Sequence, residues 1–160
     1  MLDFSDQPYR YFPPRRSAPV VWLLGHYNRM RYLPKVKRVV GVEVSGIDAL
    51  RDVRQSTDRL LLLPNHPSHA DPELFFDALR QVGLTTQTMA AYDIFLRSRL
   101  NQWVLQRSGV FSVDREGSDP KAMAECRRTL TEGRHALTIF PEGNVYLQND
   151  RVTPFHEGAA

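Results

Sequence analysis

The sequence predicts a single α/β domain with a largely parallel (mixed) sheet flanked by helices. Short apolar runs alternate with longer segments of helical periodicity, a pattern typical of parallel sheets. Three of the apolar runs end in clusters of polar residues, and parallel strands place their carboxyl ends at one edge of a sheet. The length of 160 residues suits one hydrophobic core.

Composition and cysteine content limit the class of protein. Apolar residues make up 42% of the chain and charged residues 24%, close to the averages for globular domains. No apolar run approaches the roughly 20 residues that a membrane-spanning helix needs, and no signal peptide is expected. The lone Cys126 excludes an intramolecular disulfide. Its helical spacing with Ala122 and Leu130 favours a small buried hydrophobe.

Residues 1–34 are predicted to form a basic, aromatic-rich N-terminal arm or amphipathic helix. The arm should be irregular up to about Ala18 and weakly helical from Pro19 to Leu33. Interleaved basic and aromatic residues suit an anionic membrane surface or nucleic acid, and a solvated arm fits the pattern equally well. No RNA-binding signature appears, so nucleic acid is not an expected partner.

The next three elements are read from β-branched and leucine runs. Valines between residues 36 and 44 predict a first strand, 47–55 predicts a short helix, and 59–64 predicts a buried leucine strand. Asp71 as N-cap and Pro72 as first helical residue then predict a helix that ends at Gly83.

The second half of the chain repeats the alternation. Strands are predicted at 86–92, 109–115 and 136–140. A helix from about 95 to 106 should turn Leu96, Leu100, Trp103 and Val104 inward. Asp119 and Pro120 should start the last helix, which Gly133 should end.

His66 and Asp71 lie on one tight connection after the leucine strand, close enough for a carboxylate to orient an imidazole. This arrangement suits a general base. No Gly-x-Ser-x-Gly elbow is present and Cys126 is expected to be buried, so the nucleophile should be a hydroxyl of the substrate. Asp71 would also be well explained as a helix cap alone.

Two further strand ends carry candidate binding residues. The planar guanidinium of Arg115 can donate two hydrogen bonds to a phosphate. A surface ion pair with Asp114 or Glu116 would also explain an arginine at this position. Glu142 could receive hydroxyls or neighbouring amides, and Gly143 lets the backbone approach a ligand; the Pro-Glu-Gly segment could also be only a turn.

Three blocks of the sequence carry a resemblance to a known family. The blocks are Asn65-His66-Pro67-Ser68-His69-Ala70-Asp71, Gly109-Val110-Phe111-Ser112-Val113-Asp114-Arg115 and Phe140-Pro141-Glu142-Gly143. In order and spacing they resemble those of the glycerol-phosphate and lysophosphatidate acyltransferase superfamily. The resemblance runs from about residue 36 to residue 160.

The resemblance implies a fatty acyl transfer from acyl-CoA or acyl-carrier protein to a hydroxyl of a lysophospholipid such as 1-acylglycerol-3-phosphate. It implies His66 and Asp71 as catalytic residues and Arg115 as the holder of the acceptor phosphate. The other implied substrate-binding residues are Asn65, Ser68, Phe140, Pro141, Glu142 and Gly143. No metal and no cofactor beyond the thioester donor are expected, and the location implied is the cytoplasmic face of a membrane.

Two departures from the family pattern affect these expectations. Asn144-Val145-Tyr146 follows the third block where Thr or Ser and then Arg are usual, which bears on the acceptor. The acyltransferase domain is expected over residues 35–160 and is expected to be incomplete at its C-terminus, because the family has a fourth block.

Two rival functions remain open from the sequence. A metal-dependent hydrolase could use His66, His69 and Asp71, with His135 and His156 further along the chain. A non-catalytic module could bind membranes through the basic arm.

Overall fold

Parallel strands form the centre of the protein in the computed structural model, which describes residues 8–147, 152, 154 and 155. The sheet has four strands within that part of the chain, in the order β1-β4-β2-β3. They are β1 (Leu61–Leu62), β2 (Thr86–Ala91), β3 (Val110–Val113) and β4 (Ala136–Thr138). Every neighbouring pair is parallel. The predicted α/β class with a parallel sheet is therefore confirmed.

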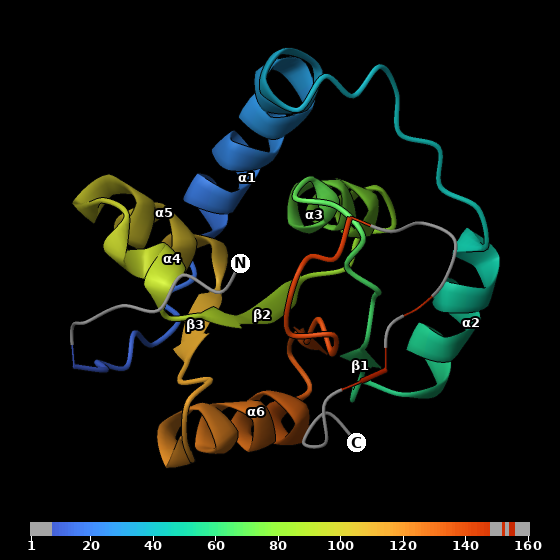
Figure 1. Ribbon diagram of the computed structural model, residues 1–160. Coiled ribbons are helices and arrows are strands. Elements are labelled where there is room, and N and C mark those ends of the chain that lie inside the picture. Colours follow the sequence, from blue (N-terminus) through green and yellow to red (C-terminus); the bar gives the residue numbers. More distant parts are fainter. Residues whose placement is uncertain (1–7, 148–151, 153, 156–160) are drawn as a thin grey trace.

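Helices connect the strands and lie on both sides of the sheet (Figure 1). The helices are α1 (Ala18–Tyr27), α2 (Ile47–Ser56), α3 (Asp71–Gln81), α4 (Asp93–Leu96), α5 (Arg99–Ser108) and α6 (Pro120–Glu132). A π-helical segment, η1 (Asn28–Val36), continues α1. In Figure 1, α6 lies below the strands, and α1 and α3 lie above them. None of the helices within the described residues is long and apolar enough to span a bilayer.

The core lies where α6 packs on β3 and β4. Phe111, Leu137, Ala122 and Cys126 are buried together there. Burial raises the pKa of the Cys126 thiol to about 11, as expected for a thiol removed from water. Cys126 is therefore a small buried hydrophobe, as its helical spacing predicted.

The segment from residue 8 to residue 17 has no helix or strand, as predicted, but it packs tightly against the domain. The amide of Phe12 donates to Ser112 Oγ at 2.8 Å, and the amide of Ser112 donates back to the Phe12 carbonyl at 3.1 Å. The Phe12 ring stacks on Phe95 with centroids 5.1 Å apart. This segment covers the β3 edge of the sheet and contributes to the core.

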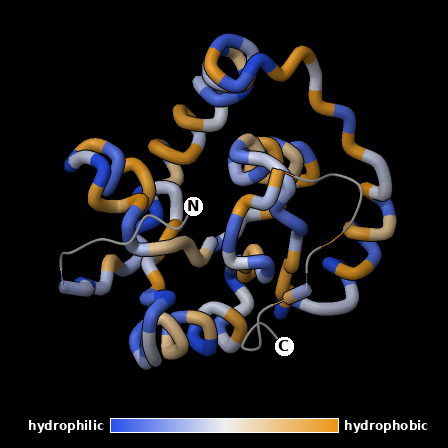
Figure 2. The backbone as a smooth tube through the Cα atoms, viewed as in Figure 1, coloured by the Kyte–Doolittle hydropathy of each residue, from blue (hydrophilic) through white to orange (hydrophobic). Residues whose placement is uncertain are grey.

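The strand predicted from the valine run is absent. Residues 37–46 have no regular secondary structure, Val40 is fully exposed, and Arg38 adopts a left-handed φ of 56°. Figure 2 shows hydrophobic and hydrophilic residues alternating along the outer connection between η1 and α2. Valine favours a strand when it packs on a half-buried sheet surface, and this connection does not pair with the sheet.

The leucine strand forms but is not buried as predicted. β1 has two residues and, among the residues that the structure describes, it lies at an edge of the sheet and pairs with β4 alone. Leu60 is buried, whereas Leu61 and Leu63 are exposed. An apolar run can occupy an edge strand, and the sequence does not show whether the second side of the strand is covered.

The helix predicted over 95–106 is divided into α4 and α5. Ser98 has extended backbone and its hydroxyl accepts from the amide of Asn101, so it caps α5. Leu100 and Trp103, predicted to face inward, are exposed, and Gln106 is buried instead. The Gln106 amide side chain donates to the Pro13 carbonyl at 2.8 Å, which satisfies its polar group away from water.

Candidate active site

The carboxyl ends of all four strands bring polar side chains to one edge of the sheet. β1 leads to His66, β2 to Asp93, β3 to Arg115 and β4 to Glu142. In open parallel sheets this edge is the usual place for a ligand. The convergence of the three predicted clusters is therefore present, with Asp93 as a fourth participant.

His66 and Asp71 form a close pair. His66 Nδ1 lies 3.0 Å from Asp71 Oδ2, and only 15% and 17% of these side chains are exposed. An ionised carboxylate can only accept, so Nδ1 carries the hydrogen and the neutral ring keeps its lone pair on Nε2. The pair has the geometry of a general base with its orienting carboxylate.

Asp71 is not the N-cap of the helix, which corrects the sequence prediction. It is the first residue of α3, and Ala70 is the N-cap. The Asp71 carboxylate turns back toward the preceding loop, where it accepts from the amide of Ser68 at 2.7 Å as well as from His66. Its second acceptor contact fixes the carboxylate that orients the imidazole.

Glu142 holds the backbone of the histidine loop. It is almost completely buried, with 3% exposed, and its Oε1 accepts from the amide of His66 at 2.9 Å. The sequence offered hydroxyls or neighbouring amides as partners of this carboxylate, whereas the amide it accepts from lies 76 positions away. The contact joins the turn after β4 to the loop after β1, which are adjacent because β4 pairs with β1.

The Phe140 ring packs against His66 on one side. The Phe140 ring centroid is 4.5 Å from that of His66 and 6.2 Å from that of Phe75 on α3. Pro141 is buried. The ring contact with Phe140 and the hydrogen bond to Asp71 together position the imidazole, which a base requires before it meets a substrate.

Asn65 and Ser68 have different surroundings. Asn65 is exposed. The Ser68 hydroxyl accepts from the amide of Ala70 at 3.1 Å, so it stabilises the loop before α3. Their predicted contacts with substrate stay a prediction.

Arg115 connects two strand ends. One terminal nitrogen donates to the Gly143 carbonyl at 3.2 Å, and the other donates to Asp93 Oδ1 at 3.0 Å. The ion pair forms with Asp93 and not with Asp114 or Glu116, the neighbours that the sequence offered as alternatives. Gly143 has a φ of 66°, a conformation that glycine adopts without strain.

Asp93 and Lys37 were missed by sequence reasoning. Asp93 directly follows the strand predicted over 86–92, so the rule that marked the other three strand ends could have found it. Lys37 follows η1, and its ammonium group contacts the His69 carbonyl and lies 3.6 Å from Glu73. Burial raises the pKa of Glu73, and the charge of Lys37 partly opposes this effect. No local pattern marks Lys37.

The other histidines do not join the His66 site. His69 is exposed. His135 precedes β4, at the opposite end of the strand, and lies 2.7 Å from Thr85 Oγ1; burial lowers its pKa. His156 lies outside the described residues. Among the residues that the structure describes, no group of three or more histidine, cysteine or acidic side chains is placed to hold a metal.

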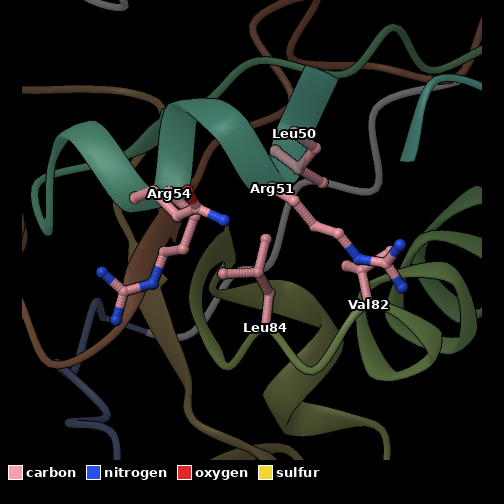
Figure 3. Close-up of a pocket in the computed structure, with 6 residues that line it drawn as sticks. Leu50, Arg51, Arg54, Val82 and Leu84 are labelled. Carbon is pink, nitrogen blue, oxygen red and sulfur yellow. The ribbon is translucent and has the colours of Figure 1, made fainter. Parts of the chain in front are cut away.

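A cavity of about 210 Å³ lies away from His66, between α2 and the connection from α3 to β2. Figure 3 shows Leu50, Arg51 and Arg54 on α2 facing Val82 and Leu84. None of the predicted site residues lines it. The hydrogen bonds at the carboxyl ends of the strands, and not this cavity, identify the candidate active site.

Comparison with known proteins identifies the family of the chain. The family model described as Acyltransferase matches residues 41–160, three quarters of the chain. No match was found among curated proteins or among solved structures. The matched region contains His66, Asp71, Arg115 and Glu142. The chain therefore belongs to the glycerol-3-phosphate/1-acylglycerol-3-phosphate acyltransferase family.

Proposed function

We propose that the protein transfers a fatty acyl group from a thioester, acyl-CoA or acyl-carrier protein, to a hydroxyl of a lysophospholipid of the 1-acylglycerol-3-phosphate type. The observation that carries this proposal is the 3.0 Å contact between His66 Nδ1 and Asp71 Oδ2. It leaves Nε2 as the proton acceptor on a ring that Phe140 packs in place. Membership of the acyltransferase family supports the reaction class.

The reaction needs no nucleophile from the protein. The acceptor hydroxyl gives its proton to His66 Nε2 while its oxygen attacks the thioester carbonyl carbon. The carbon–sulfur bond then breaks, and the leaving thiolate takes the proton from the imidazolium. The products are an ester and a free thiol, and Asp71 stabilises the imidazolium between the two steps.

Arg115 is the proposed ligand of the acceptor phosphate. Its side chain is 30% exposed, and it belongs to the same strand-end edge as His66. A guanidinium has five N–H donors, more than the two contacts to Gly143 and Asp93 use. A phosphate bound there would lie at the same edge of the sheet as His66.

Replacement of His66 tests the base. We expect His66→Ala to lower kcat by at least about a hundredfold, the usual contribution of a general base. His69→Ala is the matched control, because His69 is an exposed histidine three positions away whose contact with Lys37 uses only its backbone carbonyl. The measurement is release of free thiol together with formation of the acylated lipid. Full turnover by a folded His66→Ala protein would contradict the proposal.

The second part of the proposal is peripheral attachment to a membrane through α1 and η1. Trp22 and Leu23 on α1 and Met30 on η1 are each more than 60% exposed, with exposed Arg29 and Arg31 beside them. Exposed tryptophan and leucine next to arginines suit an interface with anionic lipids. This arrangement also supports the choice of a lipid acceptor.

Point variants test attachment better than removal of the arm, because residues 8–17 pack into the core. We expect Trp22→Ala combined with Leu23→Ala to weaken sedimentation with vesicles containing phosphatidylglycerol by about tenfold. Met123→Ala is the control, since Met123 is an exposed apolar residue on α6. Equal sedimentation of both variants would place the attachment elsewhere.

A further inference from the structure

The structure assigns Asp93 as a positioning residue that holds the Arg115 guanidinium ready for an anionic acceptor. This inference rests on the proposed function, in which Arg115 binds the acceptor phosphate. Asp93 lies outside the three sequence blocks that resemble the family. Its Oδ1 accepts from Arg115 at 3.0 Å, and 18% of its side chain is exposed.

Asp93 is itself fixed by its surroundings. It begins α4 one residue after the end of β2, and the amide of the intervening Tyr92 donates to the Val113 carbonyl at 3.2 Å. Two residues later, Phe95 is 1% exposed and stacks on Phe12. The Asn101 side chain also donates to the Ile94 carbonyl at 2.6 Å. The carboxylate therefore projects from a short turn with anchors on both sides.

Hydrogen bonds also fix the backbone on both sides of Arg115. The amide of Asp114 donates to buried Asp119 at 3.1 Å, and the amide of Glu116 donates to Asp114 Oδ1 at 2.9 Å. From there the guanidinium meets two acceptors on two other strand ends, Asp93 after β2 and the Gly143 carbonyl after β4. Two contacts from different directions fix both the position and the plane of the fork.

The two contacts leave N–H groups of the guanidinium for an anion. A long side chain that is free in solution loses rotamer freedom when it binds a ligand, and Asp93 and Gly143 impose that loss before the acceptor arrives. Preorganisation of this kind increases affinity without any new contact to the ligand. Asp93 thus acts on the acceptor through Arg115.

The Arg115 guanidinium is also connected to the loop of the proposed base, His66, through two adjacent residues. Gly143, which accepts from Arg115, follows Glu142, which accepts from the amide of His66. Displacement of Arg115 would therefore affect first the acceptor phosphate and only secondarily the imidazole. A substitution of Asp93 should therefore change the affinity for the acceptor and leave the affinity for the donor intact.

The experiment compares binding of glycerol 3-phosphate and of inorganic phosphate by calorimetry, using the full chain. We expect Asp93→Ala to weaken binding of both by about tenfold, the usual effect of removing a charge-assisted contact. Asp93→Asn, which keeps an acceptor oxygen, should bind within about threefold of the wild type. Asp48→Ala is the matched control, because Asp48 forms a similar 3.1 Å pair with Arg51 on exposed α2.

Phosphate binding that is unchanged or tighter in folded Asp93→Ala would overturn the inference, since Asp93 would then only shield the cation. Absence of binding by the wild type, or binding that Arg115→Ala leaves intact, would also overturn it. In steady-state assays the acceptor KM of Asp93→Ala should rise and the donor KM should not. Because the calorimetric result needs no turnover, a wild type that binds phosphate but transfers no acyl group would contradict the proposed function alone.

Discussion

Glu142 connects the end of β4 to the backbone of His66, and this contact defines its role at the scale of single residues. The carboxylate is buried and accepts from the His66 amide at 2.9 Å. An amide left without a partner in a buried site costs about 1–3 kcal/mol. The histidine loop therefore depends on an acceptor oxygen at position 142.

Two substitutions at this position separate the backbone contact from a contact with substrate. We expect Glu142→Ala to lower kcat by about tenfold or more and to lower the free energy of unfolding by about 1–3 kcal/mol. Glu142→Gln keeps an acceptor oxygen and should retain most of the kcat and most of the free energy of unfolding. Kinetics with varied acceptor and urea unfolding provide the measurements. A Gln variant with normal stability but a much higher acceptor KM would instead indicate direct contact with the acceptor.

At the scale of elements, Asp119 organises the start of α6. Its carboxylate accepts from the amides of Lys121 and Ala122 at 3.1 and 3.0 Å, as predicted for the N-cap, and from the amide of Asp114. The Tyr9 hydroxyl also donates to it. Burial alone would raise the pKa of Asp119, but these donors outweigh that effect and the pKa lies below its usual value.

We expect Asp119→Ala to lower the free energy of unfolding by about 2–4 kcal/mol, because a cap and further buried donors are lost together. The lowered pKa of Asp119 also predicts how the stabilisation by this residue depends on pH. The stabilisation is complete at pH values above the unfolded-state pKa of about 3.9. It is lost as the pH falls through the lower folded-state pKa. Urea unfolding at neutral and acid pH is the measurement, with Asp48→Ala as control. A variant as stable as the control would show that the cap is dispensable.

At the scale of the whole molecule, the proposed reaction uses the protein's base and the substrate's hydroxyl, with no step assigned to a metal. We expect acyl transfer to survive dialysis against EDTA with less than about a twofold change in rate. The measurement is activity and metal content of the same sample before and after dialysis. Loss of activity on chelation, restored by a stoichiometric metal, would favour the metal-dependent hydrolase.

The sequence predicted those parts of the fold that depend on neighbours a few residues away. Asp119 and Gly133 bound α6, and His66 and Asp71 share one loop, because caps and tight connections are local features. The predictions that were wrong rested on local patterns, and tertiary packing decided against them. The valine run pairs with no strand in the described part of the chain, and Leu100 and Trp103 are exposed on a helix that was expected to bury them.

The sequence by itself determined the α/β alternation from residue 59 onward, the loop shared by His66 and Asp71, and the positions of Arg115 and Glu142 after strands. Only the tertiary structure decided their partners. His66 and Glu142 are 76 positions apart and meet because β4 lies beside β1. Arg115 reaches Asp93 because β3 pairs with β2. Strand order is set by the packing of the whole core, which no local pattern in the chain encodes.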